Sequence, residues 1–433
     1  MNQTYMLKRA SKLAVALLAA SAATASQAYT LIEEEGVNLN LDVEAVVGTF
    51  RSDETYGNSE SDPAWTEGYV KYGFSGSKAL SNGSLFGAVN ALTSGTWGDG
   101  DAAGLSTGDE RETDIEDLYV GYRNDMFEFS FGRQKLVIGD GFILNGDGLN
   151  MGKGLDGIVP GFSANRGGAY WLGARQAFDK TAVLRVGGES GPRADLFWFE
   201  SDNPAQASVE MAGLNLEYVT DKGTFGLMHL KGLDVDDNEA AFLGYDGRDG
   251  QKTTSVRFQG NAGVKNLFLS AEYVDQSQGN GNPDANAWYA EAGWTFADLP
   301  WSPSLNYRYT SYDEGYDPLL FGLSRGYGTW FQGEVAANYA GPFATDSDIH
   351  YLGVKANPTE MLTVGASYFD FSDTVGGSGS NDANEIDIWA EWVAHDHLII
   401  SPLVGFYTPD SDSSTQGNDN TNTYMQVMAI VPF

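Results

Sequence analysis

The chain ends in the stretch Tyr424-Met-Gln-Val-Met-Ala-Ile-Val-Pro-Phe433, which has the pattern of a β-strand. Side chains alternate between the two faces of a strand, so one face of this stretch is apolar throughout. That face carries Met425, Val427, Ala429, Val431 and Phe433. Chain ends are usually loose and polar. An apolar strand in this place therefore predicts a β protein whose last strand lies against apolar surroundings.

This strand resembles the last strand of bacterial outer-membrane barrel proteins, whose terminal Phe helps the barrel-assembly machinery to recognise them. The resemblance implies a β-barrel in the bacterial outer membrane, with outer-membrane lipids and the assembly machinery as partners. It assigns Phe433 the role of assembly signal.

The beginning of the chain agrees with export. A basic segment, an apolar segment and a small-x-small site follow one another at Lys8, Arg9, Lys12, Leu13–Ala25 and Ser26–Ala28. We predict a removable signal peptide at 1–28 and an outer-membrane barrel at 29–433. The apolar segment is too short for a membrane anchor, which must cross about 30 Å.

Composition narrows the class of protein further. No other segment offers about 18 consecutive apolar residues, so a membrane protein would have to cross with strands. Aromatic residues make up 13% of the chain, and 54 glycines accompany only 13 prolines, which suits strands and turns. The absence of cysteine excludes disulfides and thiolate metal sites. A formal net charge of −34 argues against nucleic acid as a partner.

The rest of the chain is a series of alternating segments of roughly ten residues, separated by turn residues. The clearest examples are 265–276, 286–296 and 304–312. Many segments end in Trp, Tyr or Phe, which indicates an aromatic girdle at a membrane interface. The pattern predicts an all-β, antiparallel transmembrane barrel.

The connections between these segments have two lengths. Short turns are predicted near Gly76–Gly83, Arg123–Met126, Asp179–Lys180, Thr220–Gly223, Gly260–Lys265, Ala297–Pro303, Asn357–Glu360 and Ala394–His397. Longer polar stretches alternate with them at 51–65, 94–113, 136–168, 201–208, 231–252, 276–286, 312–344, 374–384 and 409–422. Eight short turns and nine outer loops predict about eighteen strands. Sixteen remain possible, because 169–200 could hold three strands and 329–339 looks like a strand.

A candidate channel starts at 114–123. Alternation there directs Asp117, Tyr119 and Arg123 into the lumen and Leu118 and Val120 to lipid. A Gly-rich stretch, 136–168, follows the next strand and is longer than ordinary loops. We predict that it folds inward and narrows the lumen, because strand side chains alone do not fill a barrel of this width.

Charged residues of both signs flank or populate this predicted constriction loop. The basic ones are Arg133, Lys135, Lys153 and Arg166, and the acidic ones are Asp140, Asp147 and Asp156. A constriction with both signs of charge can orient and select solutes. Arg133 shares the parity of lipid-facing Phe131, so a bulge or the end of the lipid band must turn it inward. An ordinary ion pair with a wall carboxylate such as Asp117 is the simpler role for Arg133.

Six short motifs matter together because of the order in which they occur along the chain. They are 117–123 (DLYVGYR), 131–134 (FGRQ), 139–141 (GDG), 316–319 (YDPL), 328–335 (GTWFQGEV) and 357–364 (NPTEMLTV). Together they resemble the alginate-export family of outer-membrane porins. The resemblance implies an eighteen-stranded monomeric barrel that passes an anionic polysaccharide through an arginine-lined pore. The resemblance also implies that Arg123, Arg133 and Arg308 are arginines of the lumen. The strongly acidic composition departs from what a polyanion channel needs.

The sequence shows no pattern typical of an enzyme active site or a metal site. The four histidines lack metal-ligand spacing. The acidic run 234–238 lacks the Gly and the Glu that a calcium loop requires. We therefore predict no catalytic residues, no metal and no cofactor.

The sequence thus predicts a passive diffusion channel in the outer membrane, resembling exporters of anionic polysaccharide such as alginate. One alternative is an uptake porin for small organic or hydrophilic solutes. A second is a structural barrel whose acidic outer loops anchor lipopolysaccharide through divalent cations. A solvated outer surface is the simpler interpretation of those loops.

Overall fold

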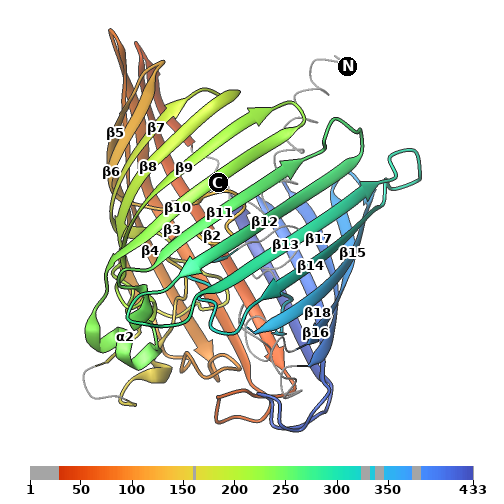
Figure 1. The fold of residues 1–433 in the computed structure, drawn as a ribbon. Coiled ribbons are helices and arrows are strands. Elements are labelled where there is room, and N and C mark those ends of the chain that lie inside the picture. Colours follow the sequence, from red (N-terminus) through yellow and green to blue (C-terminus); the bar gives the residue numbers. More distant parts are fainter. Residues whose placement is uncertain (1–28, 159–161, 323–331, 337–345, 373–381, 433) are drawn as a thin grey trace.

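A computed structural model describes residues 29–158, 162–322, 332–336, 346–372 and 382–432. The predicted signal peptide and Phe433 lie outside the described residues. Strands β2 to β19 form one closed antiparallel barrel, in which each strand pairs with the next and β19 pairs back with β2 (Figure 1). This confirms the predicted fold and the count of eighteen strands, and it rules out sixteen.

The strands of the first half are β1 Tyr29–Glu34, β2 Val37–Ser52, β3 Ala64–Leu80, β4 Gly83–Gly98, β5 Arg111–Arg123, β6 Phe127–Gln134, β7 Phe178–Gly187, β8 Gly191–Glu200 and β9 Glu210–Thr220. Those of the second half are β10 Gly223–Asp234, β11 Lys252–Gly260, β12 Leu267–Ser277, β13 Ala285–Thr295, β14 Ser304–Tyr312, β15 Ser347–Thr359, β16 Leu362–Ser372, β17 Ala383–His395, β18 Leu398–Pro409 and β19 Asn422–Pro432. The outer loops hold helix α2, Asp237–Leu243, and the short 3-10 helices η1 Lys153–Leu155, η2 Pro204–Gln206 and η3 Asp246–Arg248. Within the described residues, no helix has the length and apolar character needed to cross a membrane.

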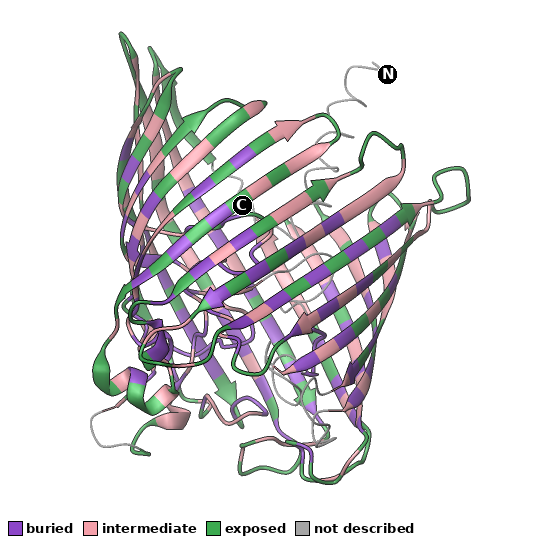
Figure 2. Cartoon of the chain, viewed as in Figure 1, coloured by how far each residue is buried: buried purple, intermediate pink, exposed green. Residues whose placement is uncertain are grey.

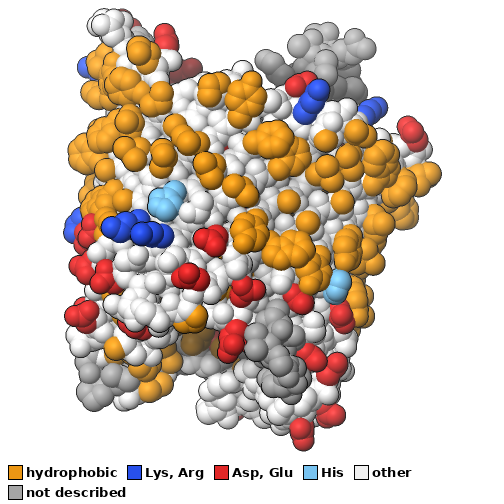
Figure 3. Space-filling view, in the orientation of Figure 1, with side chains coloured by type: hydrophobic (Ala, Val, Ile, Leu, Met, Phe, Trp, Pro, Cys, Tyr) orange, Lys and Arg blue, Asp and Glu red, His pale blue; other side chains and the backbone are white. Residues whose placement is uncertain are grey.

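The two faces of the wall differ as the alternation predicts. On β13, Ala287 and Tyr289 are buried, whereas Trp288 and Trp294 are exposed on the outside. Burial alternates along the other strands in the same way (Figure 2). On the face shown in Figure 3, outward apolar side chains gather in a belt across the barrel. Such a belt needs lipid around it, because soluble proteins rarely expose so much contiguous apolar surface.

All short turns lie at one end of the barrel and all long loops at the other (Figure 1). One predicted turn was wrong: Asp179 and Lys180 lie inside β7, and the chain turns between Gly187 and Gly191 instead. These two glycines have φ of +110° and +82°, conformations that only glycine adopts readily. Residues 169–200 consequently hold two strands. Of the strand-like stretch 329–339, the described part 332–336 lies in a loop.

The seam where the barrel closes is shared between two strands. β19 pairs with Glu44–Ser52 of β2, and β1 pairs with Val37–Leu41 of the same strand. The β1–β2 hairpin therefore covers the part of the β2 edge that β19 does not reach.

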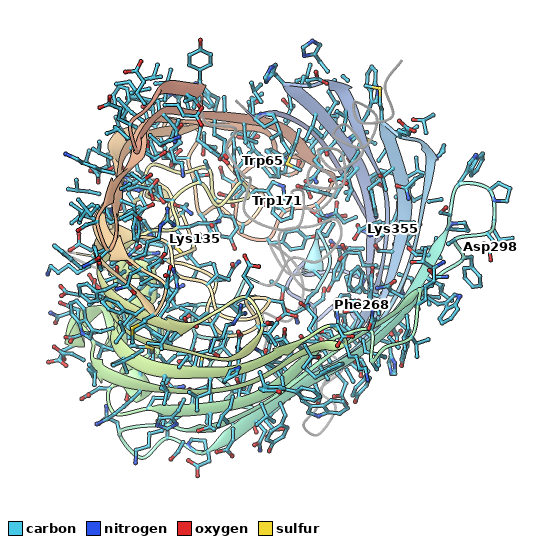
Figure 4. The ribbon with its side chains drawn as sticks, turned by 90° about the horizontal axis from the view of Figure 1, so that it is seen from above. Trp65, Lys135, Trp171, Phe268, Asp298 and Lys355 are labelled. Atoms are coloured by element: carbon cyan, nitrogen blue, oxygen red, sulfur yellow. The ribbon has the colours of Figure 1, made fainter. Side chains whose placement is uncertain are left out.

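The buried apolar core lies inside the barrel. The loop between β6 and β7, residues 135–177 and here called the inward loop, contributes buried Leu136, Phe142, Leu144 and Trp171 to it. Seen along the axis, this loop runs across the lumen and leaves part of it open (Figure 4). It places the constriction toward the long-loop end.

Candidate functional site

The inward loop begins at a β-bulge. Pairing between β6 and β7 shifts register between Gly132 and Gln134, and Gly132 has φ +121°. The bulge turns buried Arg133 away from the lipid face. Its Nη1 lies 3.0 Å from Asp179 Oδ1 and 2.7 Å from Asp202 Oδ2. Arg133 thus ties the start of the loop to β7 and to the loop after β8.

A second arginine joins the same network from the far end of the loop. Arg166 Nη2 lies 3.0 Å from Asp202 Oδ1 and 3.5 Å from Asp147 Oδ2. The Ser201 hydroxyl also donates to Asp147, at 2.9 Å. Complete burial raises the pKa of Asp147 to about 6, although Arg166 opposes this shift. Asp202 is shared by both arginines, so neither alone holds the root of the loop.

Carboxylates of the wall fix the end of the loop by accepting from its backbone. Glu116 accepts from Gln176 N at 2.7 Å and Ala177 N at 2.9 Å, and Glu67 accepts from Leu172 N at 3.0 Å. These bonds give partners to backbone N–H groups that would be costly to leave unpaired inside the barrel.

The tip of the inward loop crosses the lumen to the opposite wall. Phe142 packs against Tyr289 of β13 and Tyr312 of β14, with ring centroids 5.0 and 5.9 Å apart. The Tyr289 hydroxyl donates to Asp140 at 2.6 Å. Asn145 N donates to the carbonyl of Leu320 at 2.8 Å, in the loop after β14. The tip is therefore held by aromatic contacts with the wall and by hydrogen bonds to the wall and to the loop after β14.

Residues 332–336, here called the second segment, also enter the lumen. Buried Glu385 of β17 accepts from the backbone N–H of Glu334, Val335 and Ala336 at 2.7 to 2.9 Å. Burial and the nearby Glu385 hold the pKa of Glu334 well above its usual value. The described contacts of this segment with the wall thus centre on one carboxylate.

On the short-turn side of the constriction lies a vestibule of about 750 Å³, lined by β5 to β13 and the inward-loop tip. Its wall alternates arginines and acids on successive strands. Arg185 Nη1 lies 2.9 Å from Glu128, Arg257 Nη2 lies 2.5 Å from Glu217, and Arg193 also pairs with Glu217. This vestibule can contact a solute with both signs of charge.

The predicted site residues are distributed among several levels of the channel. Arg133, Arg166 and Lys135 lie together at the root of the inward loop, and Lys135 points into the barrel (Figure 4). Burial lowers the pKa of Lys135 to about 8. Arg123 lines the vestibule and lies 3.8 Å from Glu128.

The remaining predicted residues lie elsewhere. Asp117 pairs with Lys71 at 3.2 Å and not with Arg133, and Tyr119 is half-buried next to it on the same wall. Arg308 is buried against Glu291, at 3.6 Å. Lys153 lies in the inward loop itself, in η1, 3.2 Å from Asp109 of the loop between β4 and β5 and away from the loop's root.

Sequence reasoning missed Arg185, Arg193 and Glu385. The misplaced turn at 179–180 concealed the alternation of β7, which puts Arg185 on the lumen face. Glu385 could have been found from the alternation of β17, where it shares a face with buried Asp387 and Trp389.

A family profile described as "Alginate export" matches residues 88–317, more than half of the chain. The chain belongs to the alginate-export family. No curated protein sequence matches it. Solved structures with the same fold include the outer membrane protein OprD of Pseudomonas aeruginosa, with a TM-score of 0.57 at 10% identity over 95% of each chain. The family resemblance predicted from the motifs is thereby confirmed.

Two further structures extend this likeness. OccK11 (OpdR) of P. aeruginosa has a TM-score of 0.53 at 13% identity, covering 91% of this chain and 96% of its own. OccAB4 of Acinetobacter baumannii has a TM-score of 0.56 at 10% identity, covering 91% and 98%. Family, barrel and apolar belt together confirm the predicted location: the protein is an outer-membrane porin.

Proposed function

We propose that this alginate-export family member is a passive channel for small hydrophilic organic solutes that carry a carboxylate. The observation that supports this most is the pairing of lumen arginines with acids. Arg123, Arg185, Arg193 and Arg257 line the vestibule, yet each lies against Glu128, Asp195 or Glu217. Paired arginines can still donate hydrogen bonds to a passing carboxylate. The neighbouring acids reduce the positive potential of the vestibule, so the solute binds weakly enough to leave again.

Size supports the same proposal. The inward loop and the second segment both occupy the lumen, and the vestibule beside them has the volume of a small-molecule pocket. A long polymer would need a continuous bore with an excess of positive charge. The similarity of fold to porins such as OprD fits small solutes, which was the alternative in the sequence prediction.

The deciding experiment is flux into liposomes that contain the purified protein. Small mono- and dicarboxylates should enter, and alginate oligomers should not. Arg257→Gln should reduce carboxylate flux several-fold, whereas Lys222→Gln, an equal charge change at an exposed turn, should leave it unchanged. Equal flux in both variants would exclude the vestibule as the selective element.

Export of an anionic polysaccharide is the second candidate, because the family is described by that activity. It requires alginate oligomers to block or cross the channel from the short-turn side. Block at micromolar oligomer concentration, relieved in Arg257→Gln, would favour export over small-solute uptake.

We also propose two steps before function: removal of residues 1–28 on export, and recognition of Phe433 by the barrel-assembly machinery. Deleting Phe433 should then lower the yield of membrane-inserted barrel. A normal yield would contradict the assembly role without affecting the transport proposal.

A further inference from the structure

Two lysines face each other on the outside of the barrel. Lys231 of β10 and Lys252 of β11 are direct cross-strand partners near the long-loop end, and both are exposed. Like charges directly opposite destabilise a sheet. In a chain with 59 acidic and 25 basic residues, a carboxylate partner would be easy to supply. Yet among the described residues no ion pair joins either lysine to a carboxylate.

Other basic residues at this rim are satisfied. Three that face outward each have a partner: Arg51 with Asp62 at 3.4 Å, Lys180 with Glu200 at 2.8 Å, and Arg111 with the Trp97 ring at 4.0 Å. Two adjacent charges that form no ion pair in the described part of the barrel therefore distinguish the lysine pair from its neighbours; the exposed Asp275 of β12 lies one row away, opposite Thr254.

The same two strands continue below the lysines as an ordered column of cross-strand pairs. Toward the short turns the rows are His229 with Thr254, Leu227 with Val256, and Phe225 with Phe258. His229 Nδ1 and Thr254 Oγ1 lie 2.9 Å apart, and the two Phe rings are 4.8 Å apart between centroids. Leu227, Val256 and Phe225 are 43%, 52% and 57% exposed. Successive rows are about 7 Å apart, since each is two residues along the strand.

This order of side chains matches the cross-section of a membrane leaflet. Cations come first, then a polar row, then apolar rows. On the left side of Figure 3, a group of Lys and Arg side chains lies where the apolar belt meets the polar outer loops, with Asp and Glu side chains beside it. Because long loops face the cell exterior in such barrels, the lysines lie at the outer leaflet.

We propose that this column binds lipopolysaccharide, the phosphorylated glycolipid of the outer leaflet, with one phosphate between Lys231 and Lys252. A phosphate bears up to two negative charges and thus neutralises both ammonium groups. An acyl chain of the lipopolysaccharide lies along Leu227 and Val256. His229 and Thr254 face the polar groups that join this chain to the phosphate. This site binds through lysines directly, unlike cation bridging by acidic loops, and it is independent of the transported solute.

The test uses the full-length protein purified in detergent, with binding read by native mass spectrometry. K231Q/K252Q should bind lipopolysaccharide at least about tenfold more weakly, since each lysine at an anionic lipid surface contributes about 1 kcal/mol. The matched control, K222Q/K265Q, removes two exposed lysines from the short-turn end and should bind normally. K231R/K252R retains two cations and should also bind.

Two further ligands identify the source of the phosphate. Dephosphorylated lipopolysaccharide should bind the unmodified protein as weakly as lipopolysaccharide binds K231Q/K252Q. Phosphatidylglycerol should bind less tightly than lipopolysaccharide. Equal binding of phosphatidylglycerol, or undiminished binding by a folded K231Q/K252Q barrel, would overturn the proposal. Barrel folding is checked by the heat-dependent gel mobility of each variant.

Discussion

The inward loop and the second segment both narrow the lumen, but they are attached to the wall in different ways. The inward loop has an ionic root shared by Arg133 and Arg166, backbone contacts to wall carboxylates, and an aromatic tip. The described backbone contacts of the second segment end on Glu385 alone. The inward loop is thus attached to the wall at its root, its end and its tip. In the second segment the three described backbone hydrogen bonds share one acceptor, so substitution of Glu385 removes all three at once, although Gln426 also contacts Glu334 at 3.5 Å.

The largest expected effect is at the aromatic tip. Phe142→Ala removes a buried ring between Tyr289 and Tyr312, and such truncations cost about 3–5 kcal/mol. The tip should detach from β13 and β14, so single-channel conductance should rise and amides at 143–146 should exchange faster. Phe131→Ala, the same truncation on the lipid face, is the control and should leave conductance unchanged. No change in conductance with Phe142→Ala would mean that the tip does not limit the bore.

Glu385→Ala should have the next largest effect. It removes the acceptor of three backbone N–H groups, and unsatisfied buried donors cost about 1–3 kcal/mol each, partly recovered when water enters. The second segment should then leave the wall, with faster amide exchange at 334–336 and higher conductance. Asp387→Asn, which reduces repulsion but leaves Glu385 in place, should retain slow exchange. Equal release by both substitutions would show that charge balance, and not hydrogen bonding, holds the segment.

A smaller effect is expected at the ionic root. Arg133→Gln should destabilise the loop by about 1.5–3 kcal/mol, because it removes the charged hydrogen bonds of a buried arginine while Arg166 still pairs with Asp202. R133Q/R166Q should cost clearly more than the two single substitutions together, since they share Asp202. Additive effects on amide exchange of the loop would contradict the shared anchor.

The smallest effect concerns pH. Burial lowers the pKa of Lys135 to about 8, so its ammonium charge is present below that pH and is lost as pH rises through it. Anion preference, measured as reversal potential across a salt gradient, should decrease modestly between about pH 7 and 9. Lys135→Arg should keep the preference constant over this range. A pH step that persists in Lys135→Arg would assign the titration to another group.

The sequence predicted the barrel well because alternation is local information. In 286–296, each residue's face follows from its neighbours alone, and β13 has the predicted alternation. The parity of Arg133 even indicated the bulge beside Gly132. The turn at 188–190 was missed for two reasons. Asp179-Lys180 has equally turn-like residues, and the inward loop before β7 does not define where the next strand begins.

Partners across the lumen could not be predicted in the same way. Arg133 meets Asp202, which is 69 residues further along the chain, through a bulge and two loops whose paths no local pattern specifies. Asp117 was the example given of a wall carboxylate that could pair with Arg133, but Asp117 pairs with Lys71 of β3 instead. The aromatic contact of Phe142 with β13 and β14 likewise depends on the path of the inward loop.

The seam between β2 and β19 also has a mechanical consequence. It contains nine residue pairs, whereas β2 and β3 share fifteen. Fewer pairs mean fewer hydrogen bonds to break, so under a pulling force on β2 this strand should separate from β19 before it separates from β3. The β1–β2 hairpin lies at the short-turn end of that seam. Because β1 stays paired with Val37–Leu41, this end of β2 would remain in a paired sheet after β19 has separated.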